Sequence, residues 1–301
     1  MTHASTDSAS PGTTEFAPQR IVRIRGVDLC VQSIGRPADP AILLIAGAAS
    51  SMLHWADEFC ERLAAGSRFV IRYDHRDTGR SVSYPPGSPP YTGRDLDDDA
   101  IRVLDAFGVA AAHIVGMSMG GGIGQSLAIR HPDRVASLTL IATSPIRREP
   151  DDPDLPPPSE EVAAEFGGVS PPDWSDRAAV IDYLVGQELL CTSRSRPVPE
   201  EFVRDLATRT VDRAVSIASI NNHFVVASGD DTPRDPLASI TAPTLVVHGT
   251  EDPAFPLAHG TALADAVPGA RLLPLEHTGH ELPPAMWDAV IPAILRLSEP
   301  S

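Results

Sequence analysis

Gly116-Met117-Ser118-Met119-Gly120 lies between a β-type apolar run at 113–117 and a helix-like segment at 123–130. A G-x-S-x-G pattern between a strand and a helix is typical of a sharp turn that projects the serine hydroxyl from the end of a sheet. Glycines two residues to either side leave room for the crowded backbone of such a turn. A glycine-rich turn without chemistry is the alternative, but the strand before it and the helix after it favour a nucleophilic serine at 118.

Further apolar runs recur along the chain on both sides of this turn, and several are continuous rather than alternating. Continuous apolar runs are typical of strands covered on both faces, as in a parallel sheet, and amphipathic segments of helix length separate the later runs. This order predicts an α/β fold with a mostly parallel, doubly wound sheet of eight strands, in which functional residues follow the strand ends. The predicted strands are residues 21–24, 29–34, 41–46, 69–73, 113–117, 138–142, 244–248 and 270–275, and the predicted helices of the core are 52–64, 95–107, 123–130, 257–266 and 286–297.

The alternation of strands and helices stops between residues 144 and 236. Proline and aspartate dominate 149–158, which therefore cannot continue a strand or a helix, because proline fixes φ and removes a backbone donor. A second stretch of this kind, 230–236, precedes the return to strands. The sequence predicts a helical cap (residues 144–236), inserted after the sixth strand as a lid over the strand ends; a packing subdomain without substrate contact is the alternative. The predicted cap helices are 178–190, 200–210 and 211–224.

The core of the predicted fold is formed by 20–143 and 237–301, and the 42% apolar fraction is enough to fill it. Residues 1–19 are rich in Ser, Thr, Ala and Pro and resemble a disordered tail more than a signal peptide. No apolar stretch approaches the roughly twenty residues of a membrane span. We therefore expect no membrane partner and a cytoplasmic location.

The charge balance disfavours nucleic acid as a partner, since 40 acidic residues face 24 basic ones and the net charge is −16. Three scattered cysteines fit neither a disulfide framework nor a metal site, and a reducing compartment suits them best. No pair of histidines has metal-ligand spacing with supporting carboxylates. We expect no metal, no cofactor, a small-molecule partner, and a monomer or homo-dimer.

A serine hydroxyl needs a base to take its proton during attack, and the base needs a third group to orient it. Asp252 lies in a short turn after the predicted strand 244–248, and His280 lies in a turn after the strand 270–275. Both turns should therefore reach the edge of the sheet where Ser118 lies. Glu251 is an alternative acid and His277 an alternative base. Asp252 is preferred because Pro253 follows it at the tip of its turn, and His280 because Gly279 allows a sharp entry into the site.

The tetrahedral intermediate of acyl transfer needs hydrogen-bond donors aimed at its oxygen. We expect one from the backbone N–H of Met119, the residue after the nucleophile, and the other from the N–H of Ala48 in the small-residue loop 45–52. That loop can also be an ordinary strand-to-helix turn with Ser50 or Ser51 as N-cap, and both interpretations can hold together. Gly47, Met117 and His223 are further candidates for contact with substrate; for His223, a buried structural cluster is the alternative.

The motifs quoted above are together similar to those of the α/β-hydrolase superfamily. The resemblance also includes 73–81, which matches a D-x-R-G-x-G-x-S stretch with Asp77 at the first glycine; there Asp74 and Arg76 are expected to hydrogen-bond a tight loop near the site. The core especially resembles the aclacinomycin methylesterase group of actinobacterial polyketide pathways, over about residues 20 to 297. The residues that carry this second likeness are Ala38-Asp39-Pro40-Ala41, Asp57-Glu58-Phe59, 72–81 and 116–120.

The resemblance implies hydrolysis of a carboxylic ester without a cofactor, and a methyl ester of a polycyclic aromatic product is one such substrate. Ala46-Gly47 stands where many relatives carry His-Gly, and the cap has no transferable motif. Carbon–carbon bond hydrolysis, lactone opening, amide cleavage and cofactor-free perhydrolysis use similar triads and stay open. An inactive ligand-binding protein with the same pocket is the alternative that is not an enzyme.

Overall fold

The computed structural model describes residues 15–146, 154–168, 171–227 and 235–299. The described strands form one eight-stranded sheet in the order β1-β2-β4-β3-β5-β6-β7-β8. The pairs β1/β2 and β2/β4 are antiparallel, and all later neighbours are parallel. The predicted mostly parallel sheet is thus confirmed. Its strands are β1 Arg20–Ile24, β2 Val27–Ile34, β3 Ala41–Ile45, β4 Phe69–Tyr73, β5 Ala112–Met117, β6 Val135–Ile141, β7 Thr244–Gly249 and β8 Arg271–Leu275.

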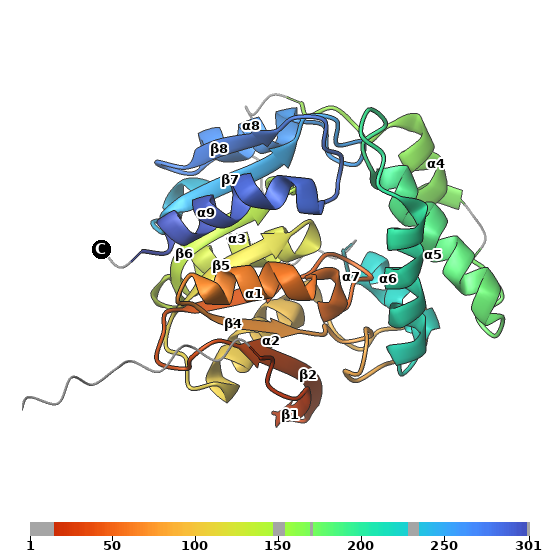
Figure 1. Cartoon of the computed structure of the whole chain (residues 1–301), viewed down its shortest axis with the longest axis horizontal. Helices are drawn as coiled ribbons and strands as arrows, with labels where there is room; N and C mark the ends of the chain where they lie inside the picture. Colours follow the sequence, from red (N-terminus) through yellow and green to blue (C-terminus); the bar gives the residue numbers. More distant parts are fainter. Residues whose placement is uncertain (1–14, 147–153, 169–170, 228–234, 300–301) are drawn as a thin grey trace, which may run out of the picture.

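Helices cover the two faces of this sheet, as Figure 1 shows. The helices α1 (Asp57–Ala65) and α9 (Trp287–Leu297) pack on one face, and α2 (Gly93–Ala106), α3 (Met119–Arg130) and α8 (Ala258–Ala266) pack on the other. The prediction of one helix over 52–64 was wrong at its start. There Met52–His54 is a separate 3-10 turn, η1, and α1 begins at Asp57. Other 3-10 turns are η2 (Pro132–Arg134), η4 (Leu237–Ser239) and η5 (Pro284–Met286).

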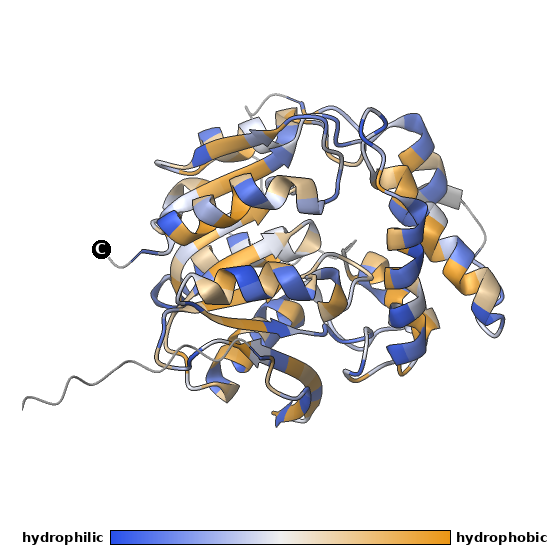
Figure 2. Cartoon of the chain, viewed as in Figure 1, coloured by the Kyte–Doolittle hydropathy of each residue, from blue (hydrophilic) through white to orange (hydrophobic). Residues whose placement is uncertain are grey.

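The core has two layers because successive strand residues point to opposite faces. In β3, Leu43 and Ile45 join one buried cluster, whereas Ile42 and Leu44 join the other, and all four are fully buried. The continuous hydrophobic colour of the central strands in Figure 2 reflects this burial from both sides. Truncation of one such leucine to alanine costs about 2–5 kcal/mol. The core therefore holds the carboxyl ends of the parallel strands, where the site lies, in fixed positions.

Among the described residues between β6 and β7, four α-helices lie beside the carboxyl ends of the strands (Figure 1). Of these, α5 begins after an Asp176 N-cap and packs against α6 through Ile181, Val185, Val203 and Ala207. Two predicted cap helices thus have observed counterparts, but no helix was predicted for α4. The helices are α4 Glu160–Gly168, α5 Arg177–Cys191, α6 Glu200–Arg213 and α7 Asn222–Ala227, with the 3-10 turn η3 Ile217–Asn221.

The predicted helix over 211–224 was wrong. Helix α6 ends at Arg213, because the Arg213 side chain pairs with the buried carboxylate of Asp74 and the Val215 N–H donates to the Gly79 carbonyl oxygen. These contacts draw the chain down onto the loop after β4, and the backbone becomes helical again only at η3.

Parts of three predicted segments lie outside the described residues. Of the predicted tail, 1–14 are outside; Phe16 lies under the guanidinium of Arg72, and the Ala17 N–H donates to the Ser33 carbonyl oxygen, so this end packs on the sheet. Of the two proline- and aspartate-rich stretches, 149–153 and 230–234 are outside. No helix of the described residues could cross a membrane, since none is both long and apolar enough.

Candidate active site

Ser118 occupies a strained turn between β5 and α3, with φ 52° and ψ −118°. This left-handed φ costs a non-glycine residue about 1–3 kcal/mol, and such strain is concentrated at functional sites. A Cβ atom on Gly116 would lie 2.1 Å from the Gly120 carbonyl oxygen, and one on Gly120 would lie 2.2 Å from the Ile45 carbonyl oxygen. Only glycine fits at either position. The Ser118 N–H donates to the Ile141 carbonyl oxygen at 2.9 Å, which ties the turn to β6.

The structure brings Ser118, His280 and Asp252 into one hydrogen-bonded chain. His280 Nε2 lies 3.0 Å from Ser118 Oγ, and His280 Nδ1 lies 2.8 Å from Asp252 Oδ2. Because a carboxylate only accepts, the Nδ1–H donates to Asp252 and leaves Nε2 free to accept the serine proton. Asp252 Oδ1 accepts from the Ala254 and Phe255 N–H groups at 2.9 and 2.8 Å, so the carboxylate cannot rotate freely.

Electrostatic interactions among these three residues favour a charged Asp252 carboxylate and a more basic His280 imidazole. Burial by itself would raise the pKa of Asp252, but the charge and hydrogen bond of His280 lower it below its ordinary value. Burial likewise disfavours the His280 cation, but the Asp252 carboxylate outweighs it and raises the pKa of His280 above 6.5. The imidazole is therefore well suited to take a proton as Ser118 attacks.

The alternative acid and base lie elsewhere. Glu251 accepts hydrogen bonds from the hydroxyl groups of Ser193 and Ser195 and contacts His277, and these bonds lower its pKa to about 2. The His277 side chain is 66% exposed, which leaves it outside the site. Through these contacts, Glu251 and His277 connect the loop after α5 to the turn after β8.

The two expected oxyanion donors, the N–H groups of Ala48 and Met119, have no protein acceptor among the described residues. Ala48, Gly47 and Met117 line a cavity of about 190 Å³ together with Ser118 and His280. A Cβ atom on Gly47 would lie 3.4 Å from Ser118 Cβ, so the loop passes close to the nucleophile. Ser51 caps η1 through the Leu53 N–H, so this loop also forms the expected strand-to-helix turn.

His223 does not line this cavity, so its predicted contact with substrate is corrected. It is fully buried; its Nδ1 accepts from the Ala49 N–H at 2.9 Å, and its Nε2–H donates to the Arg76 carbonyl oxygen at 2.8 Å. Burial lowers the pKa of His223 to about 4, which keeps the ring neutral as this pattern requires. Its contact with Ala49, which has φ 56°, supports the loop that carries the Ala48 N–H.

The loop after β4 packs beside the site, and Asp74 and Arg76 form hydrogen bonds there, as expected from the sequence. Asp74 accepts from the Met52 N–H at 2.9 Å and pairs with Arg213 of α6, so it joins the Ala48 loop to this helix. Arg76 forms a two-pronged pair with Asp99. Asp77 has φ 65°, in the left-handed region that favours glycine.

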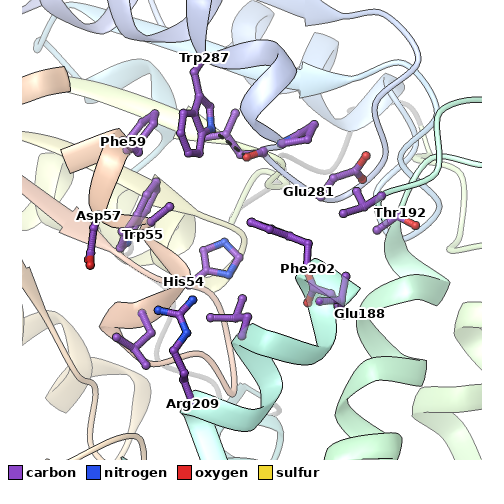
Figure 3. Close-up of a pocket in the computed structure, with 17 residues that line it drawn as sticks. His54, Trp55, Asp57, Phe59, Glu188, Thr192, Phe202, Arg209, Glu281 and Trp287 are labelled. Atoms are coloured by element: carbon purple, nitrogen blue, oxygen red, sulfur yellow. Dashed lines mark hydrogen bonds between the residues drawn. The ribbon is translucent and has the colours of Figure 1, made fainter. Parts of the chain in front are cut away.

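A second cavity of about 250 Å³ adjoins the first, and sequence analysis did not foresee it. Trp55, Phe59 and Trp287 form its aromatic wall in Figure 3. The two cavities share the wall residues His54, Glu188, Val203 and Leu206. The adjacent His54-Trp55 pair after the Ala48 loop was the available signal.

Over the residues that the structure describes, no group of three or more His, Cys, Asp or Glu residues is arranged to hold a metal ion.

A family model described as the alpha/beta hydrolase fold matches residues 40–283. The chain belongs to the α/β-hydrolase family. Similar curated proteins are two rhodomycin D methylesterases, DauP from a Streptomyces species and DnrP from Streptomyces peucetius. They are 36% and 34% identical, each over 92% of this chain and 97% of the relative.

Among solved structures, that of the enol-lactonase from Burkholderia xenovorans is similar to this chain. It is 26% identical, with a TM-score of 0.68, over 92% of this chain and 99% of the other. The resemblance expected from the sequence motifs, both to the superfamily and to actinobacterial methylesterases, is confirmed.

Proposed function

We propose that this α/β-hydrolase cleaves a carboxylic ester through an acyl-enzyme on Ser118. The observation that carries the proposal is the continuous chain from Ser118 Oγ through His280 to Asp252, with distances of 3.0 and 2.8 Å. The methylesterase relatives, similar over nearly their whole length, support ester hydrolysis independently.

In the proposed mechanism, Ser118 Oγ attacks the ester carbonyl carbon while His280 Nε2 takes its proton. The carbonyl oxygen becomes an oxyanion, held by the N–H groups of Ala48 and Met119, and Asp252 stabilises the imidazolium. The intermediate then expels the alcohol, which receives its proton from His280. Water, activated by His280, attacks the acyl-enzyme and releases the acid and the free serine.

The proposed substrate is a small, largely apolar ester, and a methyl ester of a polycyclic secondary metabolite is the specific candidate. The aromatic wall of Trp55, Phe59 and Trp287 suits a flat apolar body, and the two relatives are named as methylesterases of rhodomycin D. We further propose that residues 144–236 act as the cap over this substrate, that the enzyme needs no cofactor, and that it works in the cytoplasm as a monomer or homo-dimer.

Lactone opening is the second candidate, because the similar enol-lactonase structure covers 92% of this chain. A lactone is a cyclic ester, and its leaving alcohol stays attached to the acyl group. The same serine and histidine can act on both substrates.

A panel of p-nitrophenyl esters, methyl esters and lactones tests the proposal. The wild-type protein should hydrolyse at least one ester, and Ser118→Ala should remove several orders of magnitude of turnover while the thermal unfolding midpoint stays within a few degrees. Thr210→Ala is the matched control, since this hydroxyl lines the same cavity on α6; it should keep most of the activity. Equal turnover in Ser118→Ala would refute the proposal.

A further inference from the structure

Four side chains that line the two cavities are acidic or carry a guanidinium group, and three of them have partners. Asp57 pairs with Arg72 at 2.6 Å, and Arg209 pairs with Asp205 at 2.8 Å. Glu281 Oε1 accepts the Ser193 N–H, and burial raises the pKa of this carboxyl above its ordinary value. Each of these three groups therefore has a partner within the protein.

Glu188, the fourth, has no hydrogen bond or ion pair to any other residue that the structure describes. It lies near the end of α5, is half-buried, and belongs to the walls of both cavities. In Figure 3 it lies beside Phe202 on the helical side of the cavity, and His54 and Trp55 lie on the other side. An unpaired carboxylate thus belongs to the wall that the Ser118 cavity shares with the aromatic cavity.

The two histidines of these walls do not neutralise Glu188. Burial lowers the pKa of His54, whose Nε2 lies 3.0 Å from Met117 Sδ, so this ring stays neutral. His280 is engaged by Asp252, and the Glu188 carboxylate is a smaller contribution to its raised pKa. A cation of the ligand beside the Glu188 carboxylate would gain a Coulombic attraction that no described residue now takes up.

We propose that Glu188 determines specificity by selecting ester substrates that carry a positive charge, such as a protonated amine, and by rejecting anionic ones. The proposal rests on the ester hydrolysis proposed above and adds the charge of the substrate to it. The cationic group would lie beside Glu188 at the wall that the two cavities share, with the ester at Ser118 and the apolar body against Trp55 and Trp287.

The test compares p-nitrophenyl esters whose acyl chains end in a trimethylammonium group with isosteric esters that end in a tert-butyl group, over chains of two to five methylenes. The trimethylammonium charge does not titrate, so the pair isolates the effect of charge from shape. For the chain length that reaches Glu188, wild-type kcat/KM should favour the cationic ester. In Glu188→Gln, the ratio of cationic to neutral kcat/KM should fall roughly fivefold or more.

Asp182→Asn is the matched control, because it removes the same unit charge from the solvent side of the same helix, where Asp182 pairs with Arg204. Its ratio should equal that of the wild type. An unchanged ratio in Glu188→Gln at every chain length would overturn the inference, and so would an equal fall of the ratio in Asp182→Asn. In either case, hydrolysis of the neutral esters would still support the proposed function. Absence of Ser118-dependent hydrolysis of any ester would instead refute the proposed function itself.

Discussion

Substitution of Asp252 by asparagine should leave the fold intact and invert the proton arrangement of His280. Asp252 Oδ1 accepts two backbone N–H groups, from Ala254 and Phe255, so the oxygen of an asparagine must occupy that position. Its NH₂ group then faces His280 Nδ1, which lies 2.8 Å from Oδ2 in the wild type. A donor at this position forces Nδ1 to accept, and the ring proton moves to Nε2, which faces Ser118. The base is then blocked.

The expected loss in kcat is about 10⁴-fold, or about 5.5 kcal/mol of transition-state stabilisation. The assay is initial-rate hydrolysis of the best p-nitrophenyl ester, together with thermal unfolding to confirm a native fold. Glu251→Gln is the matched control on the same turn, since Glu251 bonds Ser193 and Ser195 rather than His280. It should lose less than about tenfold. A loss in Glu251→Gln as large as that in Asp252→Asn would refute this assignment of the acid.

Three further predictions follow from the same geometry. Because Asp252 raises the pKa of His280 and only the neutral ring is a base, kcat/KM should rise with pH through a pKa above 6.5, and a profile whose acidic limb lies below 6.5 would contradict this. Gly120→Ala places a Cβ 2.2 Å from the Ile45 carbonyl oxygen and should destabilise the protein by about 3 kcal/mol in urea unfolding. In contrast, Gly186→Ala, with open space around it in α5, should be neutral or stabilising. His223→Ala should lower kcat about tenfold with a smaller effect on KM, because the Ala49 N–H loses its acceptor, and His223→Gln should recover part of the loss; equal activity in all three proteins would exclude a positioning role.

The sheet and the relative places of Ser118, Asp252 and His280 could be predicted because their signals are local. Each residue follows an apolar strand, and the carboxyl ends of parallel strands meet at one edge of a sheet. The short turns also carry their own chemistry, such as the glycines at 116 and 120. Knowledge of distant contacts was not needed for these predictions.

Features that depend on distant contacts could not be predicted in this way. The end of α6 at Arg213 depends on Asp74 and Gly79, which are far away in the sequence. The place of His223 depends on the Ala49 N–H and the Arg76 carbonyl oxygen, and its own neighbours in the sequence do not reveal either partner. The aromatic cavity likewise combines Trp55 and Trp287 from opposite ends of the chain. Its existence is a property of the packed fold.

The central claim is that Ser118 is the nucleophile activated by His280, and covalent labelling tests it most directly. A fluorophosphonate probe is incubated with the wild type, Ser118→Ala and His280→Ala, and the labelled peptide is identified by mass spectrometry. The account predicts a single adduct on Ser118 in the wild type, none in Ser118→Ala, and much slower labelling in His280→Ala. An adduct on another residue, or undiminished labelling without the Ser118 hydroxyl, would contradict it.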